Sequence, residues 1–93
     1  FLKWFKDNEI PIIGADSCAM EQTLSTAPEE KGSMIPFHKY LMRNLGIYIH
    51  EIYMLDALAE DCAKDGVYEF FYVASPLKIK YGSGSPINPI AIK

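Results

Sequence analysis

The sequence predicts an α/β fold, because segments with helical patterns and segments with strand patterns alternate along its 93 residues. Residues 1–8 form a helical pattern and are followed by the apolar run 10–15, which suits a buried strand. The same order recurs where an amphipathic helix over 37–45 leads into 47–54, a stretch rich in β-branched and aromatic residues. A third observation is the strand pattern at 67–74. The expected architecture is a mixed sheet with short helices.

The first predicted strand carries a polar residue at its carboxyl end. Asn8 and the approaching Pro11 end the preceding helix, and Pro11 is expected only at a sheet edge or at the start of the strand. Asp16 follows this strand directly, and binding sites in α/β folds lie beyond the carboxyl ends of strands. Asp16 is therefore a candidate site residue.

The remaining segments complete a single α/β unit, since 93 residues allow one domain. Residues 17–36 have no regular period and contain several turn formers, which predicts a long loop. The stretch 55–63 consists of helix formers, and Asp65-Gly66 is a turn signal. Gly46, at the end of the 37–45 helix, is a natural left-handed residue. Two further short strands are expected, at 76–81 and 87–92.

Composition and charge exclude several classes of partner. The net charge is −3, and the nine Lys and Arg residues are scattered, so neither nucleic acid nor an anionic membrane surface is expected to bind. No apolar run approaches the roughly 20 residues that a membrane span needs. Cys18 and Cys62 have neither redox-pair nor metal spacing, and we interpret both as reduced thiols in a cytoplasmic protein, with a single bridge as the alternative.

The start of the chain is unusually apolar for a free helix. Phe1, Leu2, Trp4 and Phe5 would cover one broad side of the first helix, and the sequence begins without methionine. We interpret this as a chain cut from something longer. The alternative is a short natural protein with a docked N-terminal helix.

His38 and Glu51 form the most informative pair in the sequence. A helix after His38 advances about 10 Å to Gly46, and five extended residues run back about 16 Å, so a reversal at Gly46 brings Glu51 level with His38. In a strand over 47–54, Ile47, Ile49, Glu51 and Tyr53 would share one face. A carboxylate on an apolar face must be neutralised, paired or bound to metal, and a neutral imidazole is a suitable co-ligand for zinc or manganese.

Simpler interpretations of the same residues remain open at this point. His38 would pack against Phe37 at the start of a helix, and Glu51 would pair with Arg43 or a lysine, or face solvent. Residues 37–63 would alternatively form one long helix with Gly46 inside it. His50 is interpreted as a residue on the strand face rather than a ligand.

The ordered stretches 12–17, 38–42 and 46–51 together resemble the C-terminal part of the cyclase-like metal-dependent hydrolase family, which includes bacterial kynurenine formamidases and isatin hydrolases. Ile12-Ile-Gly-Ala-Asp-Ser17 is similar to a family strand ending in Gly-x-Asp-[Thr/Ser]. His38-Lys-Tyr-Leu-Met, followed by Gly46-Ile-Tyr-Ile-His-Glu51, is similar to the family segment "His-x-x-Leu-Leu … Gly-Ile-x-Ile-x-Glu". The resemblance extends to the elements after that glutamate, which are Leu55-Asp-Ala-Leu58, Ser75-Pro-Leu-Lys-Ile79 and Gly84-Ser-Pro-Ile-Asn-Pro-Ile-Ala-Ile92.

The resemblance implies an α/β domain of the swivelling β/β/α type and hydrolysis of an amide, cyclic amide or ester bond by metal-activated water. It places His38 and Glu51 on metal-ligating positions, with zinc or manganese as the cofactor, and Asp16 beside the active site as a supporting residue. Residues 1–93 then form the C-terminal segment of one cyclase-like domain. The partners it implies are the N-terminal half of that domain, a small amide or ester substrate and further copies of the chain in a homo-oligomer.

Three departures from the family pattern limit what this chain does alone. The N-terminal signature His-x-Gly-Thr-His-x-Asp-x-Pro-x-His, which supplies the catalytic histidine and the other ligands, is absent, so no catalytic residue is assigned here and the chain alone is expected to be inactive. One additional residue lies between His38 and Glu51, near 43–45, and Asn88 stands where many members carry Arg. The alternative function is a non-catalytic interaction module or small structural subunit that keeps the fold without a metal site.

Overall fold

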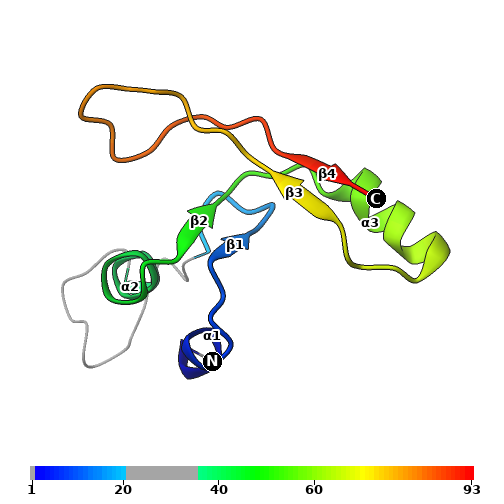
Figure 1. Cartoon of the computed structure of the whole chain (residues 1–93), viewed down its shortest axis with the longest axis horizontal. Coiled ribbons are helices and arrows are strands. Elements are labelled where there is room, and N and C mark those ends of the chain that lie inside the picture. Colours follow the sequence, from blue (N-terminus) through cyan, green and yellow to red (C-terminus); the bar gives the residue numbers. More distant parts are fainter. Residues whose placement is uncertain (1, 21–35) are drawn as a thin grey trace. The chain divides into compact units, whose positions relative to one another are not determined.

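The structure, a computed structural model, describes residues 2–20 and 36–93 and divides into two compact units, Phe1–Leu55 and Asp56–Lys93. Most of the loop expected at 17–36 lies outside the described residues. Short helices and two small two-stranded sheets make up both units, which confirms the α/β class (Figure 1). No helix in the described ranges is both long and apolar enough to cross a membrane.

The first unit begins with helix α1 (Leu2–Asp7) and strand β1 (Ile12–Gly14). Asn8 ends the helix as expected, because its backbone N–H and its side-chain amide both donate to the Trp4 carbonyl, at 3.0 and 2.8 Å. Strand β1 is shorter than the strand predicted over 10–15. It is also less buried than predicted, since Ile12 is 36% exposed and, within the strand, only Ile13 packs towards the core.

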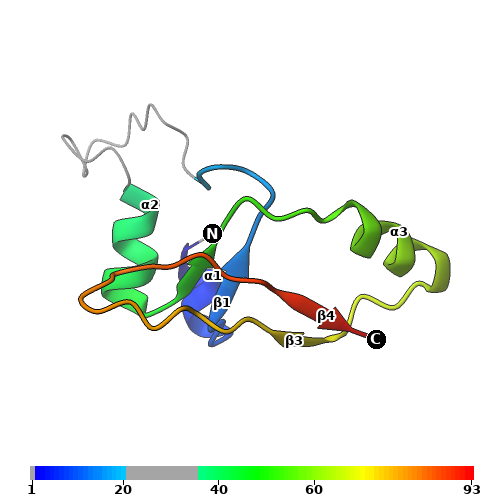
Figure 2. The same ribbon diagram turned by 90° about the horizontal axis from the view of Figure 1, so that it is seen from above.

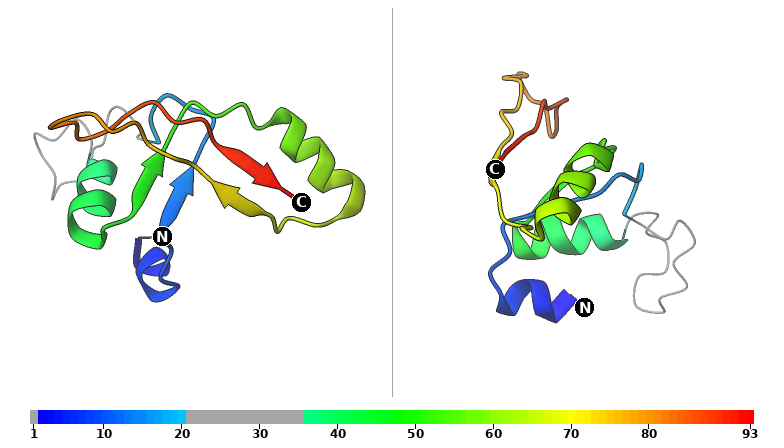
Figure 3. Two further views of the ribbon diagram at one scale, coloured as in Figure 1. Left: turned by 45° about the horizontal axis from the view of Figure 1, so that its top comes forward. Right: turned by 90° about the vertical axis from the view of Figure 1, so that its right-hand side faces the viewer.

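Strands β1 and β2 (Tyr48–His50) pair in parallel, although they are distant in sequence (Figures 1 and 3). Ile12, Ile13 and Gly14 lie opposite Tyr48, Ile49 and His50. Because the strands are parallel, their carboxyl ends lie at the same edge of the sheet, and the segments that contain Asp16 and Glu51 both begin there.

The helix before β2 is mostly a π-helix. A short α2 (Pro36–His38) continues directly into η2 (Lys39–Leu45), which confirms the predicted helix and excludes one long helix through 63. Gly46 ends η2 with φ 70°, the expected left-handed conformation, and its N–H donates to the Leu41 carbonyl five residues back. A π-helix holds one more residue per hydrogen-bonded turn than an α-helix, and the resemblance places one additional residue in this region.

The core of the first unit is centred on three buried side chains. Phe5, Leu41 and Ile47 are 5, 0 and 4% exposed and pack against one another. Partly buried apolar residues surround them, namely Leu2, Ile10, Ile13, Phe37, Tyr40, Leu45 and Ile49. This cluster joins α1, both strands and η2, and so fixes where the helix that carries His38 lies relative to β2.

The strand predicted at 47–54 is only three residues long, which is a correction to the expected alternation. Ile52 has φ 61°, so the extended conformation ends directly after Glu51. Tyr53 consequently does not follow Glu51 on one strand face, and its hydroxyl lies 2.6 Å from His50 Nδ1. The alternating pattern of apolar residues could not reveal this break, because isoleucine favours extended backbone.

The second unit consists of helix α3 (Asp56–Asp65) and an antiparallel pair of strands, β3 (Phe71–Val73) and β4 (Ile90–Ile92) (Figures 2 and 3). Gly66 follows α3 at φ 71°, as the turn signal predicted. The strands predicted at 67–74 and 87–92 are shortened to β3 and β4. The strand expected at 76–81 is reduced to a single bridge between Pro76 and Ile87.

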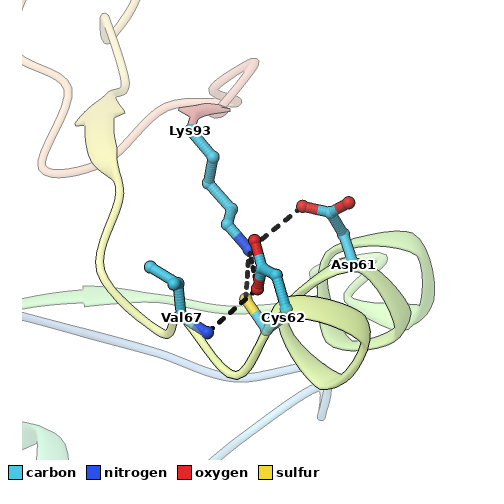
Figure 4. Close-up of polar contacts among 5 residues, drawn as sticks. Asp61, Cys62, Val67 and Lys93 are labelled. Atoms are coloured by element: carbon cyan, nitrogen blue, oxygen red, sulfur yellow. Dashed lines mark hydrogen bonds and ion pairs between the residues drawn. The ribbon is translucent and has the colours of Figure 1, made fainter.

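Lys93 joins the strand pair of this unit to α3 (Figure 4). Its ammonium group lies 2.9 Å from Asp65 and 3.1 Å from Asp61, and 3.7 Å from the Cys62 sulfur. Partial burial acts to lower the pKa of Lys93, but the hydrogen bonds to the two carboxylates outweigh it and raise that pKa well above its usual value. Cys62 is buried and Cys18 exposed, and both are free thiols, as expected.

This contact predicts acid sensitivity that depends on Asp65. The hydrogen bond from the Val67 N–H, and to a smaller extent the one from Lys93, holds the pKa of Asp65 below its usual value. Ionised Asp65 therefore stabilises the fold above about pH 4, and this contribution is lost as the pH falls through its folded-state pKa. We expect Asp65→Asn to reduce the fall in urea midpoint between about pH 6 and about pH 3. Asp7→Asn, which removes only the exposed ion pair with Lys3, is the control. An identical acid dependence in wild type and Asp65→Asn would contradict this assignment.

Candidate metal centre

The structure brings His38 and Glu51 together at the carboxyl end of β2. His38 is the last residue of α2, and Glu51 follows the final residue of β2. His38 Nε2 lies 3.4 Å from Glu51 Oε1, and the two side chains are 19 and 21% exposed. For Glu51 the sequence left open an ion pair with Arg43 or a lysine, or a carboxylate facing solvent; the structure shows it partly buried and next to His38.

A backbone amide also holds the Glu51 carboxylate. The Met20 N–H donates to Glu51 Oε1 at 2.9 Å, from the segment that follows β1. Glu51 therefore satisfies the requirement that a largely buried carboxylate be paired and hydrogen-bonded. Asp16 lies in the same segment at the shared edge of the sheet, but it is exposed and is not part of the His38–Glu51 pair.

Sequence reasoning missed a second polar pair next to this site. The hydroxyl of Tyr53 and Nδ1 of His50 form a hydrogen bond of 2.6 Å, and burial lowers the pKa of His50. The Tyr53 ring covers Gly14, where an added Cβ would lie 2.6 Å from Tyr53 Cε2. The glycine in the Ile-Ile-Gly-Ala run was the available signal, because a glycine inside a strand marks close approach of another group.

The donor set of this pair fits one half of a metal site. Two ligand atoms about 2.1 Å from a tetrahedral zinc ion lie about 3.4 Å apart, and His38 Nε2 and Glu51 Oε1 are separated by 3.4 Å. Imidazole nitrogen and carboxylate oxygen suit zinc and manganese alike. Across residues 2–20 and 36–93, no group of three or more His, Cys, Asp and Glu side chains is arranged to hold a metal.

Comparison with solved structures gives a match over almost the whole chain. A crystal structure described as a novel cyclase aligns with 99% of this chain at 42% sequence identity and a TM-score of 0.81. No model of a known protein family and no curated protein matches the chain. The match supports the resemblance to the cyclase family in both fold and sequence. The chain spans 28% of the length of that cyclase structure, in keeping with a segment of a larger domain.

Proposed function

We propose that this chain is the C-terminal part of a metal-dependent hydrolase of the cyclase family, which cleaves an amide, cyclic amide or ester bond. The observation that carries the proposal is the 3.4 Å separation of His38 Nε2 and Glu51 Oε1, in a chain 42% identical to a cyclase. Within that family, the proposed type is the one represented by kynurenine formamidases and isatin hydrolases. The proposed cofactor is zinc or manganese, held by these two residues and by ligands from the N-terminal part of the domain.

In this proposal the residues of the chain bind and orient rather than react. His38 offers Nε2 and Glu51 offers Oε1, and the Met20 N–H keeps that oxygen in place. A divalent ion held by these residues would supply a water molecule of lowered pKa and would polarise the carbonyl group of the substrate. The proton-transferring histidine is expected in the N-terminal part, and Asp16 lies at the sheet edge where the substrate would approach.

Exposed apolar side chains support the proposal that further polypeptide covers the second unit. In the register of β3 and β4, Phe71 lies opposite Ile92 and Val73 opposite Ile90, so all four share one face of the ribbon. These side chains are 68, 53, 37 and 50% exposed, in the same order. A two-stranded ribbon contributes little stability unless its apolar face is covered, so this face is expected to be buried in the complete domain.

The decisive experiment uses the complete protein, meaning this chain together with its N-terminal part. We expect stoichiometric zinc or manganese by mass spectrometry, and hydrolysis of an N-formyl arylamide or of p-nitrophenyl acetate. Activity should disappear after treatment with a chelator and return when the metal is restored. Metal binding without hydrolysis of any amide or ester would refute the proposed activity, whereas the non-catalytic module is expected to bind no metal. A protein that binds no metal would refute the assignment of the site.

A further inference from the structure

Among the hydrogen bonds that tie segment 15–20, which follows β1, to the residues around Glu51, three involve residues 51–53. The acceptors are two carbonyl oxygens of the segment and the Glu51 carboxylate. The bonds are Tyr53 N–H to Ala15 O (3.0 Å), Ile52 N–H to Ser17 O (3.1 Å) and Met20 N–H to Glu51 Oε1 (2.9 Å). The third bond reaches the oxygen that also faces His38 Nε2. A carboxylate oxygen has two lone pairs, so it can accept this N–H and still offer a ligand position.

Ile52 is held in a conformation that its side chain disfavours. Its φ is 61°, and a β-branched residue in the left-handed region is a genuine outlier. A residue keeps such a strained conformation only where the surrounding contacts hold it there, and residues of this kind are concentrated at functional sites. Here the bonds from Ile52 N–H to Ser17 and from Tyr53 N–H to Ala15 fix the backbone on both sides of the φ angle.

The left-handed turn separates two side chains that an extended strand would place on one face. Glu51 lies against His38, whereas the Tyr53 hydroxyl bonds to His50 and its ring covers Gly14. In extended backbone, residues two apart point to the same side, and Tyr53 would follow Glu51. The turn therefore keeps the bulky phenol away from the carboxylate.

We propose that segment 15–20 is a positioning element for the Glu51 carboxylate, in which the Met20 main-chain N–H fixes Oε1 towards His38 and the left-handed turn at Ile52 keeps Tyr53 aside. This inference rests on the proposed metal site. Segment 15–20 orients the carboxylate before an ion binds, so less ordering accompanies binding. The element acts through its backbone, which explains why a residue as apolar as Met20 serves at this position.

The test replaces the Met20 amide in the complete protein by an ester, using the α-hydroxy analogue of methionine. This change removes the N–H and keeps the side chain, whereas the control, Met20→Ala, removes the side chain and keeps the N–H. Chelator competition measures the zinc Kd, and the absorption spectrum of the cobalt-substituted protein reports ligand geometry. We expect the ester to weaken zinc binding about 10–100-fold and to shift the cobalt spectrum, with Met20→Ala within about twofold of wild type.

A second variant, Ile52→Gly, tests the turn. Glycine adopts the left-handed conformation freely, so zinc affinity should stay within about threefold of wild type if the backbone turn is what matters. A large loss of affinity in Ile52→Gly would overturn the role of the turn. An ester variant with unchanged Kd, in a wild-type protein that binds zinc, would overturn the positioning role alone. A wild-type protein that binds neither zinc nor manganese would overturn the proposed function as well.

Discussion

Replacing Glu51 by glutamine should remove most of the metal affinity of the complete protein. Glutamine keeps the size of the side chain and an oxygen that can accept the Met20 N–H at 2.9 Å, but it has no negative charge for the ion. Loss of a residue that merely supports a ligand costs about 10–100-fold in affinity, so loss of the ligand itself should cost at least that much. His38→Ala should act in the same direction, since it removes Nε2 from the pair.

Metal content after gel filtration, together with hydrolysis rates, checks this expectation. Glu60→Gln is the matched control, because Glu60 is an exposed carboxylate on α3. It should retain full occupancy and full activity. Full metal occupancy in both Glu51→Gln and His38→Ala would refute the assignment of these two residues as ligands, whatever activity the protein has.

Leu41→Ala should produce the largest loss of stability among substitutions in the first unit. Leu41 is 0% exposed and packs with Phe5 and Ile47, so its truncation leaves a cavity at the centre of the core. Replacing a buried leucine by alanine costs about 2–5 kcal/mol. The Leu41 carbonyl also accepts the N–H groups of Gly46 and Ile47, so displacement of this residue disturbs the turn that leads into β2.

Urea unfolding of the complete protein measures this effect. Leu41→Met conserves most of the volume and should cost less than about 1.5 kcal/mol. Arg43→Ala, at an exposed position of the same π-helix, should stay within about 0.5 kcal/mol of wild type. A loss smaller than about 1 kcal/mol for Leu41→Ala would show that the core is not centred on this side chain.

Local patterns predicted the helices well and the strands only in part. The helix ends at Asn8 and Gly46 were predictable because they depend on neighbouring backbone groups. The strands were predicted too long. A run of β-branched residues indicates a preference for extended backbone, but it does not indicate how many of those residues pair with a neighbouring strand. Predicting the pairing of β1 with β2 would have required knowledge of contacts across more than thirty positions.

The candidate site was predictable only as a pair of residues. The spacing of His38 and Glu51 around Gly46 left several interpretations open, and the ordered resemblance to cyclases favoured their interpretation as candidate metal ligands. Neither source indicated the Met20 N–H or the left-handed Ile52. A backbone donor has no side-chain signature, and isoleucine is among the residues that least favour a positive φ.

By itself the sequence determined the α/β class, the order of its elements, the left-handed Gly46 and the two candidate ligands. The tertiary structure decided that η2 is a π-helix, that β1 lies beside β2, and that His38 Nε2 and Glu51 Oε1 are 3.4 Å apart. The division has a physical reason. Propensity and periodicity act over a few neighbouring residues, whereas the site depends on a core of Phe5, Leu41 and Ile47, which are distant in sequence and meet only in the folded chain.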